Sequence, residues 1–99
     1  MVSLLAIYQT PSDPEQFLAH YTAVHAPLAQ AMPGLQGLSW GKVESLGGKQ
    51  DVFLVATMNF ADRKTLDRAL VSPEGRDAGR ALNGFAKGIV ELKVVEWQS

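Results

Sequence analysis

The chain has 99 residues, a formal net charge of −1 and no cysteine. This length suits one domain with a small core, and we expect residues 1–99 to form a single unit. The scattered basic residues give no electrostatic footprint for nucleic acid or an anionic membrane, and the lack of cysteine excludes disulfides and thiolate metal sites. The sequence shows neither the basic and apolar regions of a signal peptide nor the roughly 18 apolar residues of a membrane span. We therefore expect a soluble, cytoplasmic protein without nucleic-acid or membrane partners.

The first two predicted elements are a strand and a long helix. Residues 2–9 are almost wholly apolar and predict a strand that is buried on both faces. Residues 13–34 predict one helix, in which Asp13 is the N-cap and Pro14 takes the first helical position, where its missing N–H is harmless. Gly34, directly after a proline, provides the left-handed residue that ends the helix.

The predicted helix has one apolar stripe about 100° wide when successive residues are placed 100° apart. Tyr21 and His25, four residues apart on this stripe, bring two polar groups within hydrogen-bonding reach of the same buried partner. Pro27 lacks the N–H that would bond the Ala23 carbonyl, so we expect a kink or a frayed turn just after His25. His20 falls off the stripe and should be solvated. The stripe consists of Phe17, Tyr21, Val24, His25, Leu28 and Met32.

The sequence leaves two interpretations of His25 open. In the first, His25 is a core histidine whose ring is hydrogen-bonded to the backbone; in the second, it lies at the floor of a pocket. In the pocket interpretation, burial lowers the pKa of the imidazole, so the neutral ring can take a proton from a carbon acid or a phenol. Tyr21 would then orient or protonate an oxygen, and Tyr8 would add a second hydroxyl if it faces the helices.

The next predicted elements form a hairpin. Residues 35–46 alternate around Trp40 and predict an edge strand, and Gly37 and Gly41 indicate a bulge in it. Two glycines then turn the chain, and residues 51–60 return as a run that is apolar on both faces, which is typical of a central strand.

Two short helices and a last strand complete the predicted chain. Asp62 is the N-cap of the first of these helices, and Ser72 begins a second one. Gly75 and Gly79 weaken this second helix by about 1 kcal/mol each relative to alanine. Residues 89–97 alternate between apolar and charged side chains, which is typical of a half-exposed edge strand.

The order strand, helix, strand, strand, helix, strand predicts a ferredoxin-like α+β fold. Its antiparallel sheet would place the first and third strands at the centre and the second and fourth at the edges. Both helical regions would cover the same face, although the first strand is apolar on both sides. A second copy of the chain, packed sheet against sheet, would cover the other face, so we expect a homodimer that buries more than about 1,000 Å².

Two segments of the sequence are similar to a known family. The first is Phe-Leu-Ala-His-Tyr-Thr-Ala-Val-His-Ala-Pro-Leu-Ala-Gln-Ala-Met-Pro-Gly-Leu, and the second is Ser-Pro-Glu-Gly-Arg, followed by a phenylalanine before the last strand. Through them the chain resembles the EthD family of the dimeric α/β-barrel superfamily over nearly its whole length. The resemblance implies a ferredoxin-like protomer, a homodimer whose two sheets form a barrel, and a small pocket between sheet and helices in each subunit.

What the resemblance implies about function is less specific. Members of the family are similar to proteins encoded beside ether-degrading cytochrome P450 systems, and fungal relatives resemble tailoring enzymes of aromatic polyketides. Related barrels act as methylmuconolactone isomerases, polyketide cyclases and cofactor-free monooxygenases. The histidine of the family's helix corresponds to His25 and its aromatic partner to Tyr21. Family members often carry an acidic residue roughly where Ala81 stands, and if that acid takes part in the chemistry, this chain binds without catalysing.

The sequence offers no metal or cofactor site. His20 and His25 lie 140° apart on a helix, and no carboxylate joins them at ligand spacing. The second helical region holds no histidine, cysteine or tyrosine that could ligate haem.

We therefore predict an EthD-like homodimeric barrel that binds a small apolar or aromatic molecule without a cofactor. His25 and Tyr21 are the catalytic candidates for isomerisation, cyclisation, dehydration or decarboxylation. The alternatives are a non-catalytic ligand-binding or accessory protein of an oxidoreductase system such as a P450, and a cofactor-free monooxygenase. The residues predicted to line the ligand site are Tyr8, Phe17, Leu28, Trp40 and Phe85.

Overall fold

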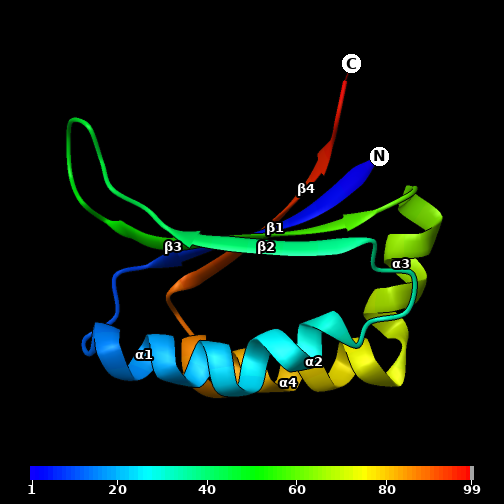
Figure 1. Ribbon diagram of the computed structural model, residues 1–99, viewed down its shortest axis with the longest axis horizontal. Helices are drawn as coiled ribbons and strands as arrows, with labels where there is room; N and C mark the ends of the chain where they lie inside the picture. The colour runs from blue at the N-terminus through cyan, green and yellow to red at the C-terminus, as the bar shows by residue number, and fades with distance from the viewer. Residues whose placement is uncertain (99) are drawn as a thin grey trace.

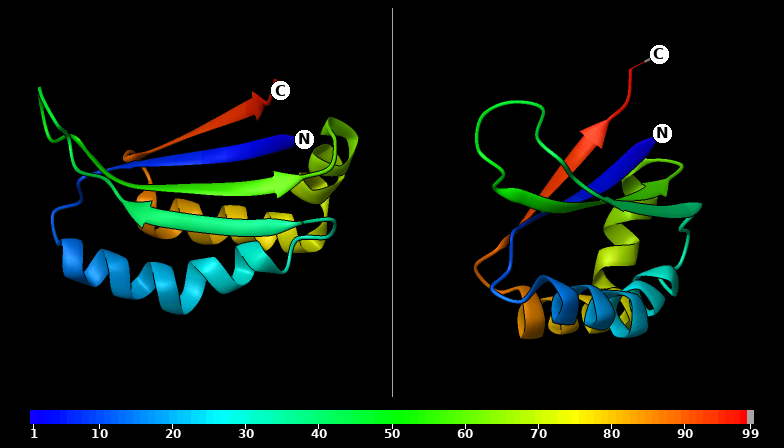
Figure 2. Two further views of the ribbon diagram at one scale, coloured as in Figure 1. Left: turned by 45° about the horizontal axis from the view of Figure 1, so that its top comes forward. Right: turned by 60° about the vertical axis from the view of Figure 1, so that its left-hand side comes forward.

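The computed structural model describes residues 1–98 and consists of a four-stranded antiparallel sheet with a layer of helices on one side and one further helix at the end of the strands (Figure 1). Two views at other angles show the same two layers, with most of the helical segments below the sheet and one helix, coloured yellow-green, beside its end (Figure 2). The elements in chain order are β1 (Val2–Gln9), α1 (Pro14–His20), the π-helical segment η1 (Tyr21–His25), α2 (Ala26–Gln30), β2 (Gly37–Lys42), β3 (Val52–Phe60), α3 (Arg63–Val71), α4 (Pro73–Ala86) and β4 (Val90–Glu96).

The sheet has the predicted ferredoxin-like strand order, β2-β3-β1-β4. β1 pairs with β3 on one side and with β4 on the other, so the two most apolar strands are central and the other two are edges, as expected. The bulge expected in β2 is wrong, because β2 pairs with β3 in unbroken register from Gly37 to Lys42. The register shifts instead between Tyr8 and Gln9 of β1, where the strand leaves the sheet.

Each predicted helix start is confirmed by a side-chain cap. The Gln16 N–H donates to Asp13 Oδ1 at 3.1 Å, and the Thr65 N–H donates to Asp62 Oδ1 at 2.8 Å. Ser72 joins two helices, because its Oγ donates to the last-turn carbonyl of Ala69 in α3 and accepts the Gly75 N–H of α4. Ser72 thus satisfies a backbone carbonyl at the end of α3 and a backbone N–H at the start of α4, so α4 can begin directly where α3 ends.

The predicted long helix continues through Pro27 by a change of helix type. Tyr21–His25 is π-helical, and the Ala26 N–H donates to the Tyr21 carbonyl, five residues back. Pro27 therefore falls in the first turn of α2, where its missing N–H is tolerated, and no frayed turn results. The helix ends at Gln30, earlier than predicted, and Gly34 has the expected left-handed φ of 81° in the following loop.

The π-helical turn also shifts the apolar face. A turn that holds an extra residue rotates the following positions by about 100° relative to a regular helix. Val24 is therefore exposed and Leu28 only half-buried, although both were expected on the buried stripe, while Ala26 and Ala29 are buried in their place.

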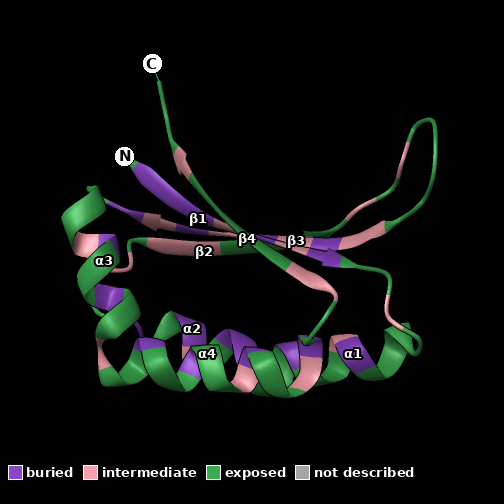
Figure 3. Cartoon of the chain, turned by 180° about the vertical axis from the view of Figure 1, so that it is seen from behind, coloured by how far each residue is buried: buried purple, intermediate pink, exposed green. Residues whose placement is uncertain are grey.

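The core lies between the helices and one face of the sheet. Figure 3 shows buried residues on the helix surfaces that face the sheet and exposed ones on the outer surfaces. The opposite face of the sheet, called the open face below, has no helix over it (Figure 1). It carries half-buried apolar and polar side chains at its centre, namely Leu5 and Ile7 of β1 and Val55 and Thr57 of β3.

None of the helices within residues 1–98 is long and apolar enough to cross a membrane.

Candidate functional site

An apolar cavity lies between the sheet and α4 and is called the inner cavity below. About 60 Å³ of it is open to water-sized molecules. Its walls come from β1, β3 and β4 on the sheet side and from η1, α2, α3 and α4 on the helix side. It is lined by Leu4, Ala6, Tyr8, His25, Ala29, Met32, Met58, Leu70, Gly75, Ala78, Gly79, Leu82 and Leu92. His25 and Tyr8 are thus the only lining residues that bring an ionisable group to this cavity.

His25 is buried in aromatic surroundings, with 6% of its surface exposed. Its ring centroid lies 5.6 Å from that of Tyr21 and 5.3 Å from that of Phe85. The Nδ1 atom is buried and has no hydrogen-bond partner among residues 1–98. The first interpretation of His25, a core histidine whose ring is hydrogen-bonded to the backbone, is therefore not seen at Nδ1. Burial, with a smaller effect of nearby His20, lowers the pKa of His25, so the imidazole is neutral near pH 7.

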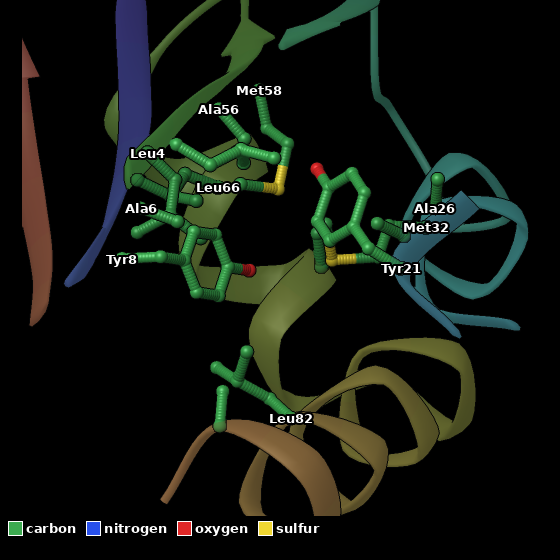
Figure 4. Close-up of a cluster of buried hydrophobic side chains, with 14 of the residues drawn as sticks. Leu4, Ala6, Tyr8, Tyr21, Ala26, Met32, Ala56, Met58, Leu66 and Leu82 are labelled. Atoms are coloured by element: carbon green, nitrogen blue, oxygen red, sulfur yellow. The ribbon is translucent and has the colours of Figure 1, made fainter. Parts of the chain in front are cut away.

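Two tyrosines from opposite layers lie near His25: Tyr21 packs against its ring, and Tyr8 lines the same cavity. Tyr8 reaches in from β1 and Tyr21 from η1, and their ring centroids are 5.7 Å apart in an edge-to-face arrangement (Figure 4). Each is only 1% exposed. Burial raises the pKa of Tyr21 to about 12 and raises that of Tyr8 further, so both hydroxyls stay protonated and can donate a hydrogen bond at neutral pH.

A second hollow, called the outer groove below, lies at the start of α1. Its volume is about 240 Å³. Phe85 separates it from the inner cavity, because the Phe85 ring lies 4.8 Å from the ring of His20 on the groove side and 5.3 Å from that of His25. The groove is lined by Pro11, Ser12, Asp13, Gln16, Phe17, His20 and Phe85.

The residues predicted for one site are divided between these two spaces. His25 and Tyr8 line the inner cavity, whereas Phe17 and Phe85 line the outer groove. Tyr21 lines neither space but packs against Tyr8 and His25.

Two further predicted residues lie outside both spaces. Leu28 is half-buried on α2, and Trp40 packs edge to face on Tyr21 from β2, at a centroid distance of 5.4 Å. Sequence reasoning missed the contributions of α4 and β4 to the inner cavity. In the sequence, Gly79 is noted only because it weakens a helix. Leu92 is included only as one of the alternating residues of the last predicted strand.

Within residues 1–98, no group of three or more histidine, cysteine, aspartate or glutamate side chains is arranged to hold a metal ion.

The chain has relatives of nearly equal length, although it matches none of the protein-family models. An uncharacterized 11.0 kDa protein from the thcB-thcC intergenic region of Rhodococcus erythropolis is 32% identical over 93 residues, which is 93% of this chain and 90% of that protein. An EthD-family protein from Bacillus halodurans, known as a crystal structure, is 31% identical with a TM-score of 0.95, and the match covers 99% of both chains.

More distant solved structures share the fold alone. SnoaB, a cofactor-independent oxygenase from Streptomyces nogalater, is 16% identical with a TM-score of 0.71, and the match covers 99% of this chain and 93% of that one. A dimeric ferredoxin-like protein of unknown function from Jannaschia sp. CCS1 is 19% identical with a TM-score of 0.73, and the match covers 97% and 98% of the two chains.

Proposed function

The chain belongs to the EthD family, and on this premise we propose that it binds a small, mostly apolar molecule in the inner cavity and moves a proton on it without a cofactor. His25 is the general base of this reaction, and Tyr8 is the hydrogen-bond donor to the oxygen of the bound molecule. Tyr21 packs against both residues and holds their rings in place, which makes it a positioning residue.

The observation that carries the proposal is the unpartnered Nδ1 of His25 beside an otherwise apolar cavity. A buried polar group without a partner destabilises a protein by about 1–3 kcal/mol, and native structures contain few of them. A bound molecule with an acidic proton would give the imidazole a partner. The lowered pKa supports this role, because only the neutral ring can accept a proton.

The proposed step is abstraction of a proton from a carbon next to a carbonyl group. The imidazole takes the proton and becomes imidazolium, while the electron pair of the C–H bond forms the C=C bond of an enolate and the π electrons of the carbonyl group move to its oxygen. The Tyr8 hydroxyl, kept protonated by burial, donates a hydrogen bond to that oxygen. Return of the proton to a different carbon would complete an isomerisation, with all atoms and electrons conserved.

The size of the inner cavity limits the ligand. A closed cavity of about 150 Å³ is known to hold benzene, whereas about 60 Å³ is open here. The reactive end of a small molecule therefore occupies the cavity, and the rest lies in its mouth. Small lactones and phenols fit this description.

We also propose that two copies of the chain associate through their open faces. Leu5, Ile7 and Val55 lie half-buried at the centre of this face, which no helix covers. A contiguous apolar sheet face is unusual on a monomer and is typical of an interface. The dimeric state of the Jannaschia protein, which shares the fold, supports this assembly.

A non-catalytic binding or accessory protein is the second candidate. It is favoured by the lining of the inner cavity, which among residues 1–98 contains no carboxylate side chain to work with His25. Ala81, where related proteins often have an acid, is half-buried on α4 and does not line the cavity.

Proton exchange in D₂O separates the two candidates. The probe is α-angelica lactone, whose hydrogens next to the carbonyl exchange when a base removes them, and proton NMR measures the loss of their signal. We expect the wild-type protein to accelerate exchange and His25→Gln to lower the rate by about 10² or more. His20→Gln, which changes the histidine outside the cavity, is the matched control and should change the rate far less, because His20 has only the smaller effect on the pKa of His25.

Equal exchange rates for wild type and His25→Gln would contradict the catalytic proposal. If the lactone shifts the cavity signals in a protein NMR titration but no exchange is accelerated, the binding function is the correct one. The absence of any binding among small lactones and phenols would contradict both.

A further inference from the structure

We propose that molecules enter the inner cavity between α3, α4 and β4, and that Gly79 is the residue that keeps this entrance open. The inference rests on the proposed function of the cavity and adds the route of entry and the residue that limits the size of the ligand.

The exposure of the lining residues locates the entrance. Three of the residues that line the inner cavity are exposed to solvent, and they come from three elements: Leu70 of α3 at 40%, Gly79 of α4, and Leu92 of β4 at 51%. The remaining lining residues are buried. The side chain of Leu92 faces the helices, because it pairs with buried Ala6 in the sheet register. The cavity therefore opens to solvent where these three residues meet.

The opposite route, through the outer groove, is closed by aromatic rings. Phe85 packs against Tyr8, Phe17, His20 and His25, with centroid distances from 4.8 to 6.4 Å. Opening this route would require the Phe85 ring to leave four aromatic neighbours. Close packing of this kind makes such a movement costly.

Gly79 is not explained by packing. A Cβ atom at this position would have no neighbouring heavy atom within 4 Å, and its φ is not in the left-handed region. Alanine would favour the helix here. Gly75, one turn earlier, has a packing reason, since its Cβ would lie 2.0 Å from the Ala69 carbonyl oxygen. What distinguishes Gly79 is its place in the cavity mouth, where any side chain would project into the opening.

The chemistry of the mouth fits an apolar ligand. Leu70 and Leu92 flank Gly79, and no charged residue lines the opening. The mouth also lies on the helix side of the sheet, because Leu92 shares a face with buried Ala6, so a dimer formed through the open face leaves it free. A side chain at position 79 should therefore restrict entry by its bulk.

The test measures access to His25 with diethyl pyrocarbonate, which attaches a carbethoxy group to a neutral imidazole nitrogen. Peptide mass spectrometry of the folded protein gives separate rates for His25 and for His20, the internal control outside the cavity. We compare wild type with Gly79→Ala and Gly79→Leu. Gly84→Leu is the matched variant, because Gly84 is another exposed glycine of α4 with open space around its Cβ, but it does not line the cavity.

We expect the His25 rate to fall slightly in Gly79→Ala and about tenfold or more in Gly79→Leu. The His20 rate should stay unchanged in both variants, and Gly84→Leu should alter neither rate. A His25 rate in Gly79→Leu within twofold of wild type would overturn the proposed entrance. So would a His25 that reacts only after unfolding in urea, because no open route to the cavity would then exist in the folded protein.

The proposed entrance and the proposed function would be contradicted by different results. If Gly79→Leu protects His25 but the wild-type protein neither binds nor exchanges the lactone, the entrance stands and the proposed function fails. If the lactone binds and exchanges but Gly79→Leu leaves its association rate unchanged, the function stands and the entrance is elsewhere.

Discussion

His25 combines two properties that are each unfavourable for stability. Its Nδ1 is buried without a hydrogen-bond partner among the described residues, and its charged form is disfavoured by burial and by nearby His20. The neighbouring Tyr21 relieves neither effect: burial raises its pKa to about 12, so it supplies no counter-charge, and its hydroxyl makes no hydrogen bond to Nδ1. Residues of this kind are retained where function requires them, and their replacement by an apolar side chain often increases stability.

We predict that His25→Leu stabilises the protein, and increasingly so at low pH. Near pH 7.5 the apolar side chain removes the unpartnered nitrogen, which is worth about 1–3 kcal/mol. Because folding lowers the pKa of His25 below its usual value of 6.5, the unfolded chain binds the proton first, and wild type loses stability as the pH falls below 6.5. His25→Leu lacks this loss. Urea unfolding at constant protein concentration between pH 5 and pH 8 measures both effects.

Tyr21→Phe is the control for that prediction, since it changes a buried neighbour and leaves the imidazole in place. It should keep the pH dependence of wild type. A His25→Leu variant that is less stable than wild type at every pH would show that the imidazole has a stabilising partner and would count against the pocket interpretation.

The helix α4 contains three glycines whose surroundings differ. Gly75 lies where α4 begins directly after α3, and the two helices approach so closely that the Ala69 and Leu70 carbonyl oxygens occupy the space of a Cβ atom. Gly79 faces the mouth of the inner cavity, and Gly84 faces open space. The intrinsic cost of glycine in a helix is the same at each position, but only at Gly75 does packing require it.

We predict opposite effects of alanine at two of these positions. Gly75→Ala should lower the free energy of unfolding by about 1–3 kcal/mol, because the methyl group meets backbone that cannot move without separating α3 from α4. Gly84→Ala should raise it by about 0.5–1 kcal/mol through helix propensity alone. Thermal melts of the two variants beside wild type check this prediction. A Gly75→Ala melt at or above that of wild type would mean that the two helices do not meet as closely as described.

The open face determines how the whole molecule behaves in solution. Within residues 1–98, the helices pack on one face of the sheet only, although both central strands carry apolar side chains on both faces. On the open face, Trp97 Nε1–H donates to Ser3 Oγ and the Ser3 hydroxyl donates to Asn59 Oδ1, so polar groups there are satisfied within the chain. The apolar centre of the face is the surface through which we propose that a second copy binds.

We predict that Ile7→Lys converts a dimer into monomers. A charge at the centre of the interface would have to be buried without a partner, which is far more unfavourable than loss of the apolar contact alone. Sedimentation equilibrium at micromolar concentration should give the dimer mass for wild type and the monomer mass for the variant. Val24→Lys, at an exposed apolar position of η1 on the helix side, is the matched control and should remain dimeric. A folded wild-type monomer at this concentration would refute the assembly.

The fold could be predicted because its signals are local and agree with one another. The caps at Asp13, Asp62 and Ser72 and the apolar runs of β1 and β3 each indicate the element that the structure contains. The candidate site could be predicted only in part, because the hydrophobic pattern of a regular helix does not reveal the π-helical turn. That turn shifts Leu28 away from the core, and the cavity walls depend on how α4 and β4 pack.

The central position of β1 has a consequence for the order in which the protein forms during synthesis. Val2 pairs with both Phe60 and Glu96, and the Trp97 N–H donates to the Met1 carbonyl, so β1 is joined to segments that are synthesised much later. Until the ribosome has released β3 and β4, the nascent chain holds an apolar strand with both edges unpaired, and such a strand is prone to aggregation. The sheet therefore closes only after β4 has left the ribosome, and a chain that stops before Val90 would leave one edge of β1 permanently open.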